Sequence, residues 1–192
     1  MVVFLLLLTS LLCRRLWHNR KLHILRLLHW FQPFDDDHSK QFDGFVSYTS
    51  ADWDLRFVTE SLVPHLEGKM NFNLCLHHRD FVAGSFIADN ITEAVRRSRR
   101  TLLVVTSAYL HSTWCKFEYQ VALHEMLGER HRVLPIVMCD VTRDNMEPTL
   151  TSLLDVVTWL EYPGDGCSQQ ELNRFWERLQ LSMPKKRPND ER

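Results

Sequence analysis

Beyond residue 40 the chain alternates short apolar runs with longer segments of helical periodicity, and this alternation constrains the fold more than any other feature. The strand-like runs cover residues 42–48, 71–76, 101–106, 132–138 and 156–160. The helical patterns cover residues 52–66, 86–98, 113–127 and 169–182, with a short helical turn near 148–154. Runs such as 101–105 are apolar on both faces, which is typical of parallel strands buried between two helix layers. The alternation therefore predicts an α/β fold, a three-layer sandwich around a five-stranded parallel sheet in the flavodoxin-like order 2-1-3-4-5.

The first residues form an apolar segment that ends in two arginines. Residues 1–12 are apolar except for Thr9 and Ser10, and Arg14 and Arg15 follow. A helix that crosses a bilayer needs about 20 apolar residues, so this segment is too short to span a membrane alone. Apolar residues followed by arginines are typical of the cytoplasmic end of a membrane span. We therefore predict that residues 1–13 are the end of a single-pass transmembrane segment, or a short membrane anchor, with all later residues in the cytoplasm.

A basic segment follows, which we interpret as a juxtamembrane helix and acidic linker over residues 14–37. Leucines recur here near the helical period, so an amphipathic helix lying against anionic lipid headgroups is expected. Residues 1–31 carry no carboxylate and five cations, which are Arg14, Arg15, Arg20, Lys21 and Arg26. The chain's net charge of −1 leaves −6 for the other residues, so no nucleic-acid partner is expected of them. We place one globular domain at residues 38–183 and a disordered tail at 184–192.

The cysteine pattern and the absence of common enzyme motifs argue against several kinds of functional site. Five cysteines are an odd number, and none forms a C-x-x-C pair, which favours reduced thiols in the cytosol. Cys75, His77 and His78 have no second ligand cluster at a usable spacing, so no metal site is predicted. The sequence also lacks the G-x-S-x-G, P-loop, G-x-G-x-x-G and H-E-x-x-H patterns. No cofactor is therefore expected.

The predicted strand order alone indicates where a ligand-binding opening, here called the mouth, would lie on the sheet. Open α/β sheets bind ligands at the carboxyl ends of their strands, where the strand order reverses. In the order 2-1-3-4-5 the reversal lies between the first and third strands. The loops 49–52 and 77–85 and the start of the helix that carries Glu118 would surround it. Ser50 and Asp52 either line this mouth as a nucleotide contact or cap the helix that follows.

Four motifs, taken in order, resemble the Toll/interleukin-1 receptor (TIR) domain, specifically the cytoplasmic domain of a Toll-like receptor. They are Phe42-Asp43-Gly44-Phe45-Val46-Ser47-Tyr48, Arg79-Asp80-Phe81-Val82-Ala83-Gly84, Trp114-Cys115-Lys116-Phe117-Glu118 and Phe175-Trp176. The resemblance covers about residues 40 to 182. It implies the same flavodoxin-like fold and a signalling role in innate immunity. By this resemblance, two receptor TIR domains form a homo- or heterodimer and recruit TIR-domain adaptor proteins through homotypic contacts.

The resemblance also implies which surfaces bind partners. The adaptor-binding loop consists of Arg79, Asp80, Phe81, Val82, Ala83 and Gly84, although the same residues could form a plain surface turn. Many relatives have proline where this chain has Ala83, so the loop is expected to be more flexible here. A secondary interface for an acidic partner or the membrane surface is formed by Arg96, Arg97, Arg99 and Arg100. The alternative for these arginines is a favourable interaction with the end of a helix.

Glu118 leaves an enzymatic alternative open. TIR domains that cleave NAD⁺ use a glutamate in this helix, so Glu118 would be catalytic in an NAD⁺ glycohydrolase and NAD⁺ would be its substrate. The structural alternative is a first-turn glutamate that interacts with the helix dipole. A further alternative is a membrane-anchored TIR decoy that binds adaptors without an ectodomain. Phe175 and Trp176 fall at helical spacing and are expected to pack against the sheet.

Overall fold

A computed structural model describes residues 39–128, 132–139, 141–164 and 166–185. The predicted membrane segment 1–13 and basic segment 14–37, and all but the first two residues of the predicted tail 184–192, lie outside the described residues. Within the described residues, no helix has both the length and the apolar character that a membrane crossing requires. The described residues up to Pro184 form one compact unit.

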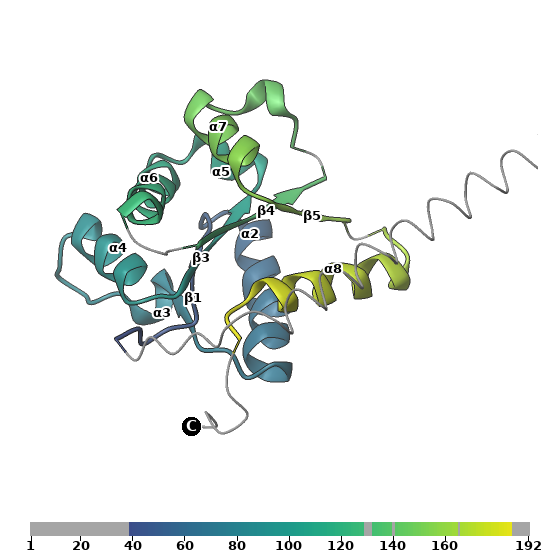
Figure 1. The fold of residues 1–192 in the computed structure, drawn as a ribbon, viewed down its shortest axis with the longest axis horizontal. Coiled ribbons are helices and arrows are strands. Elements are labelled where there is room, and N and C mark those ends of the chain that lie inside the picture. Colours follow the sequence, from purple (N-terminus) through teal and green to yellow (C-terminus); the bar gives the residue numbers. More distant parts are fainter. Residues whose placement is uncertain (1–38, 129–131, 140, 165, 186–192) are drawn as a thin grey trace, which may run out of the picture. The chain divides into compact units, whose positions relative to one another are not determined.

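The centre of this unit is a five-stranded parallel sheet with strand order β2-β1-β3-β4-β5 (Figure 1). The strands are β1 (Gly44–Ser47), β2 (Leu74–Leu76), β3 (Arg100–Val105), β4 (Arg132–Met138) and β5 (Leu160–Tyr162). Every residue of β3, and every residue of β4 except its first, is buried. The predicted fold class and strand order are confirmed.

Helices cover both faces of the sheet (Figure 1). One face carries α2 (Asp52–Arg56), its continuations η1 (Phe57–Leu62) and η2 (Pro64–Lys69), and α8 (Gln169–Ser182). The other carries α4 (Ile87–Arg96), α5 (Ser107–His111), α6 (Thr113–Gly128) and α7 (Pro148–Val156). Two short turns complete the described elements, α3 (His77–Asp80) after β2 and η3 (Arg143–Asn145) after β4.

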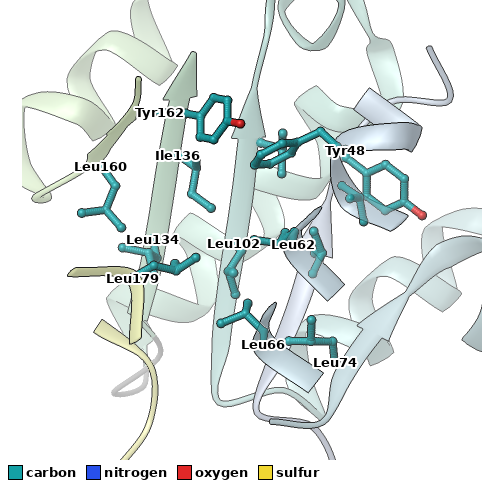
Figure 2. Packing of buried hydrophobic residues seen from close by; sticks show 14 of the residues in the cluster. Tyr48, Leu62, Leu66, Leu74, Leu102, Leu134, Ile136, Leu160, Tyr162 and Leu179 are labelled. Atoms are coloured by element: carbon teal, nitrogen blue, oxygen red, sulfur yellow. The ribbon is translucent and has the colours of Figure 1, made fainter. Parts of the chain in front are cut away.

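Alternation along the strands divides the core into two layers. Leu102 and Val104 of β3 contribute to the layer beneath η1, η2 and α8, whereas Leu103 and Val105 contribute to the layer beneath α4 to α7. Figure 2 shows part of the first layer, where leucines of η1, η2 and α8 meet alternate residues of the strands. Phe175 and Trp176 lie buried in this layer, as their helical spacing predicts. The sheet is therefore apolar on both faces, which explains why its strands read as continuous apolar runs.

The fifth strand was predicted too early in the chain. The sequence favoured a strand at 156–160, but α7 continues to Val156 and the strand begins at Leu160. Pro148 occupies the first turn of α7, where a missing N–H costs nothing. Leu150, Leu153 and Leu154 are then buried at helical spacing, so the apolar residues after Pro148 form a full helix rather than a short turn.

Candidate functional site

Glu118 lies inside the protein at the carboxyl end of β1. Its side chain is 4% exposed, and one carboxyl oxygen accepts a hydrogen bond from the Ser47 hydroxyl. The Tyr109 hydroxyl lies 2.9 Å from the same Ser47 oxygen and also donates to the Cys115 carbonyl at 3.3 Å. Burial raises the pKa of Glu118 to about 7, and the hydrogen bond from Ser47 only partly opposes this effect. A carboxyl group that titrates near neutral pH is thus held against the end of β1.

The position of Glu118 corrects one sequence-based interpretation. Helix α6 begins at Thr113 and has no acidic residue in its first turn. Glu118 therefore lies in the second turn and faces β1, so a stabilising interaction with the helix N-terminus is wrong as its explanation.

Two histidines after β2 contact the aromatic residue that follows β1. The Tyr48 hydroxyl is hydrogen-bonded to His78 Nδ1, and the His77 ring lies 4.3 Å from the Tyr48 ring. Burial, together with the neighbouring His78, lowers the pKa of His77. Burial and then Glu118 raise the pKa of Tyr48 well above its ordinary value. The residues after β1, the residues after β2 and Glu118 are thus close neighbours, as the topology led us to expect.

Arg79 and Asp80 point back toward the body of the domain. The Arg79 guanidinium donates to both carboxylate oxygens of Glu67 at 3.0 Å and also to the Leu74 carbonyl. These hydrogen bonds raise the pKa of Arg79 above its ordinary value, with Glu67 the main cause. Asp80 accepts the Leu76 backbone N–H at 2.7 Å. Both charged residues of the predicted adaptor-binding loop therefore anchor the loop to η2 and β2.

The residues that follow form an exposed apolar surface, which we call the loop apex and define as Val82, Ala83, Gly84 and Phe86. Val82 is 63% exposed and Phe86 is 81% exposed. Asn90 fixes the base of the apex, since its side chain accepts the Val82 N–H and donates to the Val82 carbonyl, both at 3.2 Å. Gly84 has a φ of +86°, a conformation that favours glycine. Phe81 is only partly exposed and its ring lies 6.1 Å from the Phe45 ring.

Sequence reasoning missed Phe86 as part of this surface. It assigned residue 86 to the start of the following helix, whereas α4 begins at Ile87 and buries Ile91, Ala94 and Val95. The sequence did carry a signal for it: Phe86 is a large aromatic residue that stands just before the buried positions of α4 and is not one of them. Ile87, also exposed, extends the apex onto the helix.

Ser50 and Asp52, the predicted mouth residues, are both exposed. Neither caps α2, because the N-cap position is Ala51 and carries no side-chain hydrogen bond, so the capping interpretation is wrong. Thr49 stabilises the turn before the helix instead: its hydroxyl accepts the Ala51 N–H at 3.2 Å and donates to Asp54 at 2.5 Å. Sequence reasoning did not single out Asp54, which is buried.

The predicted arginine cluster divides into surface and interior residues. Arg100 is buried within β3, so it cannot contribute to a surface interface. Arg99 pairs with Asp43 at 3.4 Å, with both side chains largely buried. Arg97 pairs with Glu93 at 3.6 Å and lies over the Phe42 ring, while Arg96 is exposed. Only Arg96 and Arg97 remain on the predicted secondary surface.

Across the described part of the chain, no three His, Cys, Asp or Glu side chains gather as a metal site would require.

Comparison with known proteins identifies the family. Residues 41–191 match the family model of the TIR domain. The chain is 34% identical to Protein toll of Drosophila melanogaster over 87% of its own length, and 34% identical to Toll-like receptor 13 of Mus musculus over 88%. It spans only 15% and 17% of the length of these two relatives.

Solved structures agree with this match. The TIR domain of the Toll-related receptor TRR-2 from Hydra magnipapillata superimposes with a TM-score of 0.55 at 25% identity, covering 72% of this chain and 94% of that one. A metazoan TIR-STING receptor from C. gigas has the same TM-score at 24% identity, covering 77% of this chain and 41% of that one, and supports the fold alone. The chain therefore belongs to the TIR-domain family and is closely related to the TIR domains of Toll and Toll-like receptors.

Proposed function

We propose that this chain is the cytoplasmic signalling part of a Toll-like receptor, which dimerises and recruits TIR-domain adaptors by homotypic contact. Its similarity to Protein toll and to Toll-like receptor 13 supports the receptor assignment. The apolar segment and the arginines that follow it support attachment to the cytoplasmic face of a membrane. A membrane-anchored decoy would bind the same adaptors, and the presence or absence of an ectodomain in the full gene product distinguishes the two.

The loop apex is the observation that carries the recruitment proposal. It presents apolar side chains to solvent on a base that is fixed by Arg79, Asp80 and Asn90. Anchoring the base limits the conformational entropy that the loop loses when a partner covers the apex, which favours binding. Two of the six residues predicted for adaptor contact, Arg79 and Asp80, then act by holding the loop. The direct contacts fall to the apex, and Arg96 and Arg97 form a secondary surface.

The apex is tested by adding a charge where a partner would be apolar. In a pull-down with TIR-domain adaptors, Val82→Asp and Phe86→Asp in the full chain are expected to reduce adaptor capture about tenfold or more. Val156→Asp is the matched control, because Val156 is 74% exposed and lies on α7. Circular dichroism checks that all three variants fold, since exposed positions tolerate such changes. Adaptor capture that is equal in all four proteins would exclude the apex as the contact.

Replacing Asp80 or Phe81 would be a less informative test of the loop. Asp80 accepts a backbone hydrogen bond from β2, and Phe81 packs near Phe45, so changing either side chain also disturbs the fold. A loss of adaptor binding in those variants would not separate contact from stability.

The second candidate function is NAD⁺ cleavage, and one observation favours it. Glu118 is a buried carboxyl group with a pKa of about 7 at the carboxyl edge of the sheet, and perturbed carboxyls of this kind are typical of catalytic sites. The full chain at high concentration is assayed for nicotinamide release from NAD⁺, beside Glu118→Gln and the apex variant Val82→Asp. Turnover that disappears only in Glu118→Gln would establish the activity. No turnover by a folded chain that captures adaptors would leave signalling as the function.

A further inference from the structure

A pocket opens at the carboxyl edge of the sheet, and Glu118 does not line it. Its volume is about 370 Å³, and its lining includes Trp53, Asp54, Thr106, Met138 and Tyr162. Thr106 directly follows β3, Met138 ends β4 and Tyr162 ends β5, so the pocket lies where open α/β sheets bind ligands. Pockets that bind small molecules commonly measure about 300 to 1,000 Å³. Position and size both fit a small-molecule site.

Asp54 is the only acidic side chain among the described residues that line this pocket, and it has no cationic partner there. It is 2% exposed and accepts hydrogen bonds from Thr49 at 2.5 Å and Thr106 at 2.9 Å. No Lys, Arg or His of the described residues forms an ion pair with it. The first turn of α2 and the two hydroxyl donors favour a carboxylate at this position. Buried carboxylates usually face a cation as well, because removing a charge from water is costly.

The walls beside Asp54 are aromatic and held in place. The Trp53 ring stacks on the Phe57 ring at 5.4 Å between centroids and meets the Tyr162 ring edge-on at 6.4 Å. Tyr162 also packs against Phe57 and Phe175, so it is fixed from two sides. Faces of Trp and Tyr attract cations, and a preformed site loses little entropy when a ligand enters. An apolar or aromatic body carrying a positive charge fits these walls.

We propose that this pocket binds a small organic cation, a protonated amine or amidine on an aromatic or aliphatic body, with its charged group on Asp54 and its body against Trp53 and Tyr162. The site is separate from the loop apex and from Glu118. A ligand here contacts Asp54, whose partner Thr106 also accepts the Tyr109 N–H at 3.0 Å, and Tyr109 in turn reaches the Ser47–Glu118 pair.

The charge requirement is tested with two probes of the same shape, benzamidine and its neutral analogue benzamide. Saturable binding to the full chain is followed by ligand-observed NMR. Asp54→Asn, which keeps the size and hydroxyl contacts of the side chain, is expected to weaken benzamidine binding about tenfold or more. Asp52→Asn is the matched control, because Asp52 lies in the same helical turn but is exposed and does not line the pocket. Equal binding of the two probes, equal affinity in Asp54→Asn, or no saturable benzamidine binding would overturn the proposal.

A second measurement needs no variant, which matters if Asp54→Asn does not fold. Cys139 is an exposed thiol on the pocket lining, and Cys167 is a partly exposed thiol outside that lining. Benzamidine is expected to slow alkylation of Cys139 by iodoacetamide relative to Cys167, as measured by peptide mass spectrometry, and benzamide is expected to have no effect. Alkylation of Cys139 at the same rate with and without benzamidine would also overturn the site.

Discussion

Glu118 places a carboxyl group in the protein interior, where its ionisation acts against folding. The folded protein holds this proton up to a pH of about 7, whereas the ordinary value is 4.5. Over this interval the folded state binds more protons than the unfolded chain, so the contribution of Glu118 to stability falls as pH rises and then levels off. The two values differ by about 2.5 pH units and each unit corresponds to about 1.4 kcal/mol, so the loss by about pH 8 is roughly 3 kcal/mol.

This linkage gives a prediction for Glu118→Gln, which keeps the size of the side chain but cannot ionise. The variant is expected to be more stable than the unmodified chain at about pH 8 by roughly 3 kcal/mol, and to lose most of this advantage at about pH 5. Urea unfolding of both proteins at the two pH values measures the difference. Tyr109→Phe is a useful companion, because it removes the hydroxyl next to Ser47 and leaves the carboxyl group in place. A stability difference that is the same at both pH values would show that ionisation of Glu118 is not its cause.

The residues of the candidate site were predictable by type but not by orientation. The motif 79–84 was predicted as one contact surface, yet Arg79 and Asp80 bind Glu67 and β2 while residues 82–84 face solvent. Glu67 lies twelve positions before Arg79 and just after the predicted helix 52–66, so no local pattern joins the two. Asp54 was missed for the same reason: its hydrogen-bond partner Thr106 follows β3 and lies 52 positions later in the chain.

At the level of the elements, β1 depends on a glycine for its close contact with β3. A Cβ atom added to Gly44 would lie 2.7 Å from Leu102 Cδ1, and Leu102 is fully buried. Gly44→Ala is therefore expected to destabilise the protein by about 1 to 3 kcal/mol through overpacking. Gly68→Ala is the matched control: no atom lies within 4 Å of its added Cβ in η2, so a gain of about 0.5 kcal/mol is expected. Urea midpoints compare the two, and similar values for both variants would contradict this account of β1.

Helices were predictable where their apolar residues recur over several turns, and strands were predictable where both of their faces are buried. Helix α8 has the predicted bounds 169–182, because its buried residues recur over several turns and Ser168 forms a capping box with Glu171. The run 101–106 is likewise strand β3, shifted by one residue. The short elements α3 and α5 were not foreseen, since four or five residues carry too little periodicity to be recognised.

At the level of the whole domain, the two core layers share the strands of one sheet, so neither layer is a separate unit. Leu66 belongs to the layer beneath η2 and Leu153 to the layer beneath α7, and each is almost fully buried. Residues of β3 and β4 alternate between these layers, so loosening one layer also removes packing from the strands that support the other. Cooperative unfolding of both layers follows from this sharing.

Leu66→Ala and Leu153→Ala test this cooperativity from opposite faces. Each is expected to lower the free energy of unfolding by about 2 to 5 kcal/mol, because each leaves a cavity in a close-packed layer. Each is also expected to leave the urea m-value unchanged, since the same surface is exposed in one transition. Far-UV circular dichroism and tryptophan fluorescence should report coincident midpoints, Trp176 lying in the first layer and Trp159 against the second. Two separated transitions, or a variant that shifts the midpoint of one probe alone, would mean that the two layers unfold independently and that the shared strands β3 and β4 do not couple them.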